Sequence, residues 1–252
     1  PVLCRPFDHG AAITTYSTTK YIGGHGTTIG GLIVDGGNFD WGKAGADRQP
    51  AMNTPDPCYG GVVWDEQVTK NMGLPFAYLL KLRTTLLRDL GGAMSPFNAW
   101  MFIQGLETLP LRMREHAKNA QAVAEALAAN KKVQSVTYPG LFEGAEKEKA
   151  DKYMTGGYGA LIGFELPGGK EAGSKFIDSL ELLYHVANIG DSRSLAIHPA
   201  TTTHSQLAPE EQLSAGVTPG YVRLSIGIEN VEDIIADICL LYTSDAADER
   251  NS

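Results

Sequence analysis

Apolar residues recur at helical spacing over two long stretches in the first half of the chain. Over residues 75–90 they fall on one face of a predicted helix. Ser95 and Pro96 then suit the N-cap and the first turn of a second predicted helix, which runs to about residue 130. Pro110 lies inside this second stretch, and we expect it to kink or split the helix because its ring removes a backbone hydrogen bond.

After residue 130 the pattern changes to short apolar stretches bounded by turn residues. VQSVTYPG, GALIGFELPG, YHVANIG and YVRLSIGI predict strands, while residues 171–182 and 231–241 predict helices. Two earlier strands are predicted at 13–16 and within GLIVDGG, and the Gly-, Pro-, Asp- and Asn-rich segment 39–61 is predicted to be a long functional loop. Strands that alternate with helices indicate an α/β fold.

The pattern also divides the chain. We expect a first region over 1–95, a connecting helix over 96–130 and a second α/β unit over 131–238. The amphipathic stretch ENVEDIIADI loses its period near its end, and residues 239–252 turn polar. We interpret this tail as non-native sequence and assign it no function.

Composition narrows the class of protein. The 252 residues are 43% hydrophobic and 20% charged, as in ordinary globular proteins, and the formal net charge of −8 argues against nucleic acid or an anionic membrane as a partner. Three scattered cysteines favour a reducing, cytoplasmic setting over a disulfide framework or zinc site, and no metal is expected. No apolar run reaches the length of a membrane span.

The segment YSTTKYIGGHG carries the first candidate chemistry. Ser17 and Thr19 alternate along a chain taken as extended, so their hydroxyls should point to one side and cradle a phosphate beside backbone amides. Lys20 follows and could bond as a Schiff base to pyridoxal 5'-phosphate (PLP). A surface lysine remains an alternative, as does a dinucleotide loop in GHGTTIG, although that motif lacks a convincing βαβ context.

Two further stretches could contact a substrate. In YVRLSIG, Arg223 points away from the apolar set and is either an exposed strand arginine or a clamp for a carboxylate. NIGDSRSLAIHPATTTH is dense in small polar residues, Ser194 among them, and reads as a polar loop that could touch a substrate. Its histidines, His198 and His204, are more simply structural.

Together these segments resemble the Cys/Met-metabolism family of PLP-dependent enzymes. YSTTKYIGGHG is similar to the family's lysine motif, SLAIHPATTTHSQL to its Ser-Leu…His-Pro-Ala…Thr-His stretch, and VRLSIGIEN to its Arg-Leu-Ser-x-Gly-x-Glu stretch. The resemblance extends from Pro1 to about Ile238. NFDW and LLRDLGGAMSPFNAWMFIQGLETLPLRM bring it closest to the O-acetylhomoserine sulfhydrylase branch.

The resemblance implies an aspartate-aminotransferase-like α/β fold, with 1–95 as the end of the large PLP-binding domain and 131–238 as the small C-terminal domain. It implies that Lys20 carries PLP, that Ser17 and Thr19 hold the cofactor phosphate, and that Arg223 binds the substrate α-carboxylate with Ser194 nearby. The implied reaction is γ-replacement, in which O-acetylhomoserine and sulfide give homocysteine and acetate. A homotetramer is the expected assembly.

The sequence also departs from the family's pattern. The aspartate that pairs with the pyridine nitrogen and the tyrosine that stacks on the PLP ring belong to segments that would precede Pro1. We therefore expect a C-terminal part of a longer enzyme, with little activity alone. A cystathionine or methionine γ-lyase and a non-catalytic binding module remain the alternatives.

Overall fold

The computed structural model describes residues 2–239, and these form two compact units. The smaller unit consists of Arg5–Ser17 and Gly30–Ala99. The larger consists of Pro1–Cys4, Thr18–Ile29 and Trp100–Ser252, within the described residues. The predicted tail lies outside the described part except for Cys239, which ends the last helix. The predicted domain bounds of the whole protein stay a prediction.

The smaller unit contains one hairpin and several short helices. Strand β1 (Ile13–Ser17) pairs antiparallel with β2 (Gly31–Asp35), so both predicted strands form. Helices α1 (Trp41–Arg48) and α2 (Pro50–Asn53) occupy much of the segment predicted to be one long loop. That prediction was wrong because local capping outweighs the Gly and Pro content: the Asp40 side chain accepts a hydrogen bond from the Lys43 amide at the start of α1.

The helix predicted over 75–90 forms without a break over residues 77–90, with a π-helical stretch in its middle. Helix α3 (Ala77–Lys81), a π-helical stretch (Leu82–Leu87) and α4 (Arg88–Leu90) follow one another directly. A small apolar core supports this unit, and its buried members are Met52, Trp64, Val68 and Ala77.

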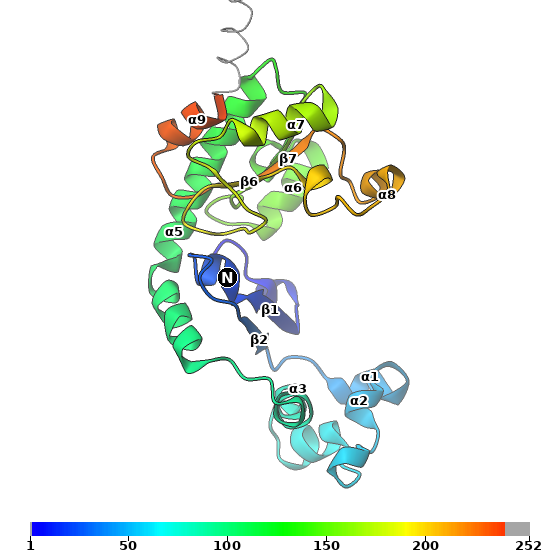
Figure 1. Cartoon of the computed structure of the whole chain (residues 1–252). Coiled ribbons are helices and arrows are strands. Elements are labelled where there is room, and N and C mark those ends of the chain that lie inside the picture. The colour runs from blue at the N-terminus through cyan, green and yellow to red at the C-terminus, as the bar shows by residue number, and fades with distance from the viewer. Residues whose placement is uncertain (1, 240–252) are drawn as a thin grey trace, which may run out of the picture. The chain divides into compact units, whose positions relative to one another are not determined.

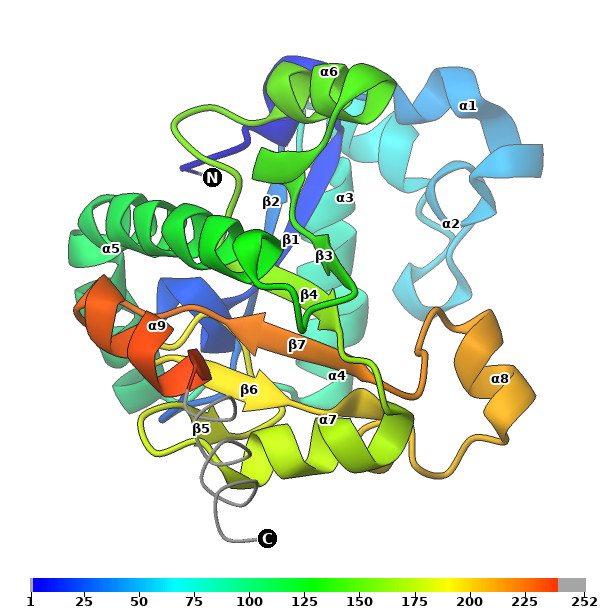
Figure 2. The ribbon, with the colours of Figure 1, turned by 90° about the horizontal axis from the view of Figure 1, so that it is seen from above.

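The larger unit is built on a five-stranded sheet in the order β3-β4-β7-β6-β5, which Figure 2 shows from above. The strands are β3 (Ser135–Thr137), β4 (Leu161–Glu165), β5 (Tyr184–His185), β6 (Leu195–Ile197) and β7 (Tyr221–Ser225). All neighbours are antiparallel except β5 and β6. Strand β6 lies inside the stretch predicted to be a polar loop. The sequence did not predict it, because three residues are too few to show a period.

Helix α5 (Pro96–Ala129) is continuous through Pro110 (Figure 1), so the predicted split does not occur, and its C-terminal half packs against this sheet. The other helices of the larger unit are α6 (Gly144–Tyr153), α7 (Gly169–Asp178), α8 (Pro209–Ser214) and α9 (Val231–Cys239). Sequence periodicity predicted α7 and α9 but not α6 and α8. The α/β fold class is confirmed by a solved structure reported below.

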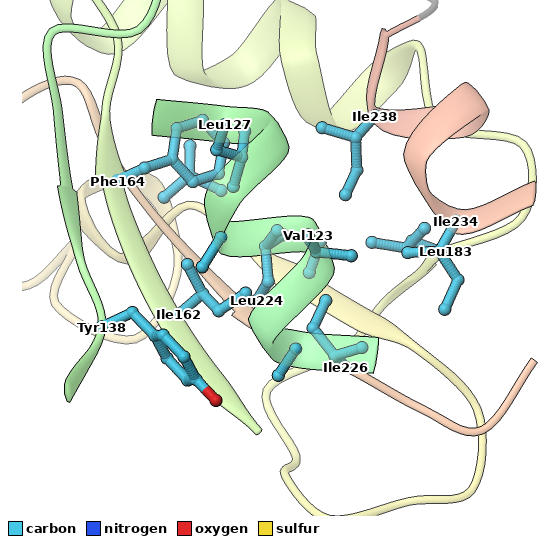
Figure 3. Close-up of a cluster of buried hydrophobic side chains, with 14 of the residues drawn as sticks. Val123, Leu127, Tyr138, Ile162, Phe164, Leu183, Leu224, Ile226, Ile234 and Ile238 are labelled. Carbon is cyan, nitrogen blue, oxygen red and sulfur yellow. The ribbon is translucent and has the colours of Figure 1, made fainter. Parts of the chain in front are cut away.

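The main core lies on one face of the sheet, under α5, α7 and α9 (Figure 3). Val123 and Leu127 of α5 meet Ile162 and Phe164 of β4, and Leu224 of β7 is fully buried among them. Burying one such side chain contributes roughly 1.5–3 kcal/mol to folding. This packing fixes β7, and with it the direction of the side chains on its opposite face.

Candidate active site

The backbone turns sharply around Lys20. Strand β1 ends at Ser17, and Thr18–Ile22 form a π-helical turn. The Gly23 amide donates to the Thr18 carbonyl and the Gly24 amide to the Lys20 carbonyl, both at 2.8 Å. The chain is therefore not extended through Thr19, and the alternation assumed from the sequence was wrong beyond Ser17. Ser17 itself closes β1 in the smaller unit.

Helix α5 supports this turn from below through Arg112. The guanidinium donates to the carbonyl oxygens of Tyr21 (2.7 Å), Ile22 (3.3 Å) and Gly105 (2.7 Å). Arg112 is only 6% exposed, and burial lowers the pKa of its guanidinium. Among residues 2–239 no carboxylate forms an ion pair with it. Arg112 therefore acts as a fixed donor that ties the carbonyl oxygens of the Lys20 turn to helix α5.

Glycine at position 105 lets the turn approach the helix. A Cβ placed there would collide with the carbonyl oxygens of Ile22 and Gly23. Any larger residue would therefore push the turn that carries Lys20 away from α5.

The loop 188–194 closes over the turn from the other side. Ser192 donates twice to the Gly24 carbonyl, from its amide at 2.8 Å and from its hydroxyl at 2.9 Å. The Gly190 amide donates to the Ser225 hydroxyl of β7 at 3.0 Å. Gly190 adopts φ 73°, and a Cβ there would lie 2.7 Å from the Tyr21 nitrogen, so only glycine fits.

Lys20 and Arg223 meet at one residue of this loop, Asn188. The Lys20 Nζ donates to Asn188 Oδ1 at 2.5 Å, and the Arg223 Nη2 donates to the Asn188 carbonyl oxygen at 3.1 Å. All three residues are half-buried. The structure thus brings together two cationic side chains that are 203 positions apart in sequence (from 20 to 223).

Arg223 is held in place but incompletely satisfied. Its Nε is buried without a hydrogen-bond partner, and within the described residues no carboxylate pairs with its guanidinium. Burial lowers the pKa of Arg223. A half-buried guanidinium with a spare N–H is suited to receive an anion, because carboxylates accept from that planar fork in a bidentate way.

Tyr21 packs next to these groups. Burial raises its pKa to about 12, while a hydrogen bond with Ser225 and the charge of Arg223 act in the opposite direction. Its ring meets the His116 ring edge-on with centroids 5.4 Å apart. His116 Nδ1 lies 2.6 Å from the Ile226 carbonyl and therefore donates to it, while burial lowers the pKa of His116 and favours the neutral ring.

Ser194, the other predicted substrate contact, is fully buried. Its hydroxyl donates to a Glu229 carboxylate oxygen at 2.9 Å and accepts from the Gly227 amide at 2.8 Å. Its amide donates to the other Glu229 oxygen at 2.6 Å. These contacts join β6 to the segment after β7, and a role for Ser194 in binding substrate stays a prediction.

Hydroxyls gather around a small cavity on the far side of the turn. The cavity has a volume of about 20 Å³, which suffices for one water molecule. It is lined by Thr19, Gly23, His25, Gly26, Thr27, Thr28 and Met101. The Oγ1 atoms of Thr18 and Thr28 are buried without a partner. Thr28 lines this cavity and Thr18 lies in the turn itself, so both unsatisfied hydroxyls belong to the segment around Lys20.

Two other kinds of site find no support in the described part of the chain. Between residues 2 and 239, no three histidine, cysteine, aspartate or glutamate side chains gather as they would around a metal ion. None of the helices described is both long and apolar enough to cross a membrane.

The family model for Cys/Met metabolism PLP-dependent enzymes matches residues 1–240. The chain belongs to this family. The resemblance inferred from the three motifs is thereby confirmed.

Over the aligned part, two curated relatives are identical to this chain at about half of the positions. An O-acetyl-L-homoserine sulfhydrylase from Leptospira meyeri is 52% identical over 242 residues, which cover 94% of this chain and 54% of the relative. A homocysteine synthase from Schizosaccharomyces pombe is 49% identical over 235 residues, covering 93% and 53%. The chain therefore spans about half the length of the curated relatives it matches.

A solved structure in the family has the same fold. It is described as an O-acetylhomoserine (thiol)-lyase from Campylobacter jejuni with N'-pyridoxyl-lysine-5'-monophosphate. It is 39% identical, has a TM-score of 0.85, and the match covers 95% of this chain and 55% of that one.

Sequence reasoning found Lys20 and Arg223 but missed three residues that hold them. Arg112 had a signal, because a single arginine interrupts the apolar face of α5 between Leu109 and Met113. Tyr21 lay inside the lysine motif and was assigned no role. No sequence signal pointed to Asn188, since only the folded loop brings it to Lys20.

Proposed function

We propose that this chain carries the reactive lysine and the carboxylate-binding arginine of a PLP-dependent sulfhydrylase. The whole protein would join O-acetylhomoserine and sulfide to give homocysteine and acetate. The observation that carries the proposal is the meeting of Lys20 and Arg223 on Asn188, with no carboxylate paired to either among the described residues. The sulfhydrylase and homocysteine synthase relatives favour this reaction over a γ-lyase.

The residues present fit PLP. Lys20 would hold it covalently, and Ser17 and Thr19 would hold its phosphate, with Thr19 lining the small hydroxyl-rich cavity. When bound, PLP withdraws electrons from the amino acid attached to it and makes the Cα proton acidic. The hydroxyls of Thr18 and Thr28, buried without a partner in the same segment, support an acceptor-rich group such as this phosphate beside the turn.

The side chains of this chain then have separate tasks. Arg223 binds the α-carboxylate of the substrate through its free N–H groups and so orients the Cα–H bond. Lys20, as a neutral amine, takes the proton from Cα. Ser194 would lie near the same carboxylate, acting through its amide and hydroxyl partners rather than as an independent donor.

We propose further that the whole protein acts as a homotetramer in the cytoplasm and that this 252-residue chain alone has little activity. The family resemblance supports the first statement. The second rests on the family's pyridine-nitrogen aspartate and stacking tyrosine, which belong to segments that this chain does not match. Size-exclusion chromatography with light scattering and an assay of homocysteine formation test them separately.

Covalent labelling tests the central proposal. The chain is mixed with PLP, reduced with borohydride and digested, and pyridoxyl-lysine is mapped by mass spectrometry. We expect the adduct at Lys20 in the unchanged chain and in Lys43→Ala, which removes an exposed lysine of α1. Lys20→Ala should lose it. If surface lysines are labelled and Lys20 is not, the proposal is wrong and the alternative of a non-catalytic binding module is favoured.

A further inference from the structure

Asn188 contacts the two proposed functional side chains with two different atoms. Its side-chain oxygen accepts from Lys20, and its main-chain oxygen accepts from Arg223. A substitution at this position can therefore remove the contact to Lys20 and leave the contact to Arg223 in place. Few positions allow two functional groups to be separated in this way.

The surroundings fix the direction of the Asn188 side chain. A Cβ at Gly26 would lie 3.1 Å from Asn188 Nδ2, so the amide group packs against the glycine backbone. Two residues further along the loop, Gly190 is tied to β7 through the Ser225 hydroxyl, and Ser192 is tied to the Gly24 carbonyl. The loop therefore presents the side-chain oxygen of Asn188 to Lys20 from a backbone anchored on both neighbouring elements.

The chemical type of this acceptor matters. An amide oxygen orients an amine but carries no net charge, so it does not stabilise the ammonium form as a carboxylate would. Reaction of an amine with an aldehyde requires the neutral amine. An aspartate at this place would orient Lys20 equally well and hold it protonated.

We propose that Asn188 is a positioning residue that holds the Lys20 amine beside Arg223 through a neutral acceptor, and so keeps the amine available for reaction. This inference rests on the proposed function, in which Lys20 bonds to the PLP aldehyde with loss of one water. Asn188 is not itself a catalytic residue, because it acts through Lys20.

Other charged and titratable groups lie on the turn itself and on the elements packed against it. They are Tyr21 and His25 of the turn segment, Asp191 and Arg193 of the loop, Arg223 of β7, and Arg112 and His116 of α5. Asp191 is the one buried carboxylate among them, and it already pairs with Arg193 at 3.3 Å. A new carboxylate at 188 would thus be the first one to pair directly with Lys20.

The test compares Asn188→Asp with Asn130→Asp. The second variant adds the same charge at the C-terminal end of α5 and is the matched control. Brief reductive methylation with formaldehyde over a pH series, followed by peptide mass spectrometry, gives the pH midpoint at which Lys20 becomes reactive. We expect Asn188→Asp to move this midpoint upward by about one unit, which is roughly tenfold less reactive amine at a given pH below it. Asn130→Asp should leave it unchanged.

A third variant covers the case in which Asn188→Asp does not fold, as judged by circular dichroism. Asn188→Ala adds no charge, so the midpoint should stay in place while PLP labelling of Lys20 falls severalfold because the amine is no longer oriented. Binding of a carboxylate at Arg223 should persist, since the main-chain contact remains.

The outcomes separate the two proposals. An unchanged midpoint in Asn188→Asp, or unchanged PLP labelling in Asn188→Ala, would overturn the role of Asn188. If the unchanged chain takes no PLP at Lys20 while Asn188→Asp still shifts the midpoint with formaldehyde, the contact is real and the proposed function is wrong.

Discussion

The two faces of strand β7 differ in their surroundings: one lies in the apolar core and the other faces the candidate active site. On one face Val222 and Leu224 are fully buried in the main core. On the other face, Arg223 and Ser225 meet the loop that carries Asn188. The first face belongs to a cluster of buried apolar side chains, whereas the second face holds a guanidinium with a buried N–H that no described residue accepts.

The difference shows where stability and function are placed. The apolar face contributes free energy of folding through burial, and the polar face contributes little because desolvation of charge offsets its hydrogen bonds. A strand of five residues can serve both because successive side chains alternate. Substitutions on the first face should therefore lower stability, and those on the second should change ligand binding.

Leu224→Ala should have the largest effect on stability. Leu224 is fully buried, so truncation removes apolar contacts and leaves a cavity, with an expected loss of about 2–5 kcal/mol in the free energy of unfolding. Urea denaturation followed by circular dichroism measures it. The matched control is Leu161→Ala on the neighbouring strand β4, where the side chain is 38% exposed and the loss should stay below about 1 kcal/mol. Equal losses in both variants would contradict the comparison.

Arg112→Met should rank next. The methionine keeps the apolar stem but removes the guanidinium that donates to the carbonyl oxygens of Tyr21 and Ile22 in the turn, at an expected cost of about 2–4 kcal/mol. Hydrogen exchange should accelerate at the Gly24 amide, inside the turn, more than in β4 or β7.

Arg114→Met is the control for that variant, because Arg114 is two residues further along the same helix and its side chain is exposed. Its stability should change by less than about 0.5 kcal/mol. Uniform acceleration of exchange throughout the unit in Arg112→Met would mean that Arg112 supports the fold in general and not the Lys20 turn.

Tyr21→Phe should have a smaller effect, which appears in how the free energy of unfolding depends on pH. The pKa of Tyr21 is about 12 in the folded chain and about 10.0 unfolded, so the protonated phenol favours the folded state. That contribution is complete below pH 10 and is lost as the pH rises towards 12, with a ceiling of about 2.7 kcal/mol. Tyr21→Phe should lose less stability over this interval than the unchanged chain.

The control for the alkaline transition is Tyr184→Phe, because Tyr184 is 54% exposed. It should keep the full loss of stability between pH 10 and 12. If Tyr21→Phe shows the same loss as Tyr184→Phe, then the phenol of Tyr21 is not desolvated as the structure indicates.

The apolar face was the part of this comparison that the sequence predicted well. Val222, Leu224 and Ile226 alternate with polar residues, so the period alone indicated which side is buried and that Arg223 lies opposite. The lysine motif likewise singled out Lys20 as a candidate, and its role stays a prediction. In both cases the information lies within a few neighbouring residues.

The supports of the polar face could not be predicted in the same way. Asn188 reaches Lys20 across 168 positions, and Arg112 reaches Tyr21 across 91. No local period encodes such contacts, and Gly190 and Gly105 show their importance only when the backbone they approach is known. Short elements were not predicted for a related reason. Strand β6 has three residues, which are too few to display alternation.

Arg223→Met should have the smallest effect on stability and is the sharpest test of the comparison. Burial without an ionic partner makes the Arg223 guanidinium costly to the fold, so the methionine variant should unfold at the same urea concentration or a higher one, within about 1 kcal/mol. Under the proposed function, in which Arg223 binds the substrate carboxylate, the affinity of the PLP-loaded protein for O-acetylhomoserine, measured by calorimetry, should nevertheless fall roughly 10–100-fold, because that charged hydrogen-bonded contact is lost. Arg193→Met, whose side chain is 53% exposed, is the control and should bind more nearly as the unchanged protein does. A variant at 223 that loses more stability than Arg112→Met would show that this face, too, holds the fold together, and that the division between the two faces of β7 is false.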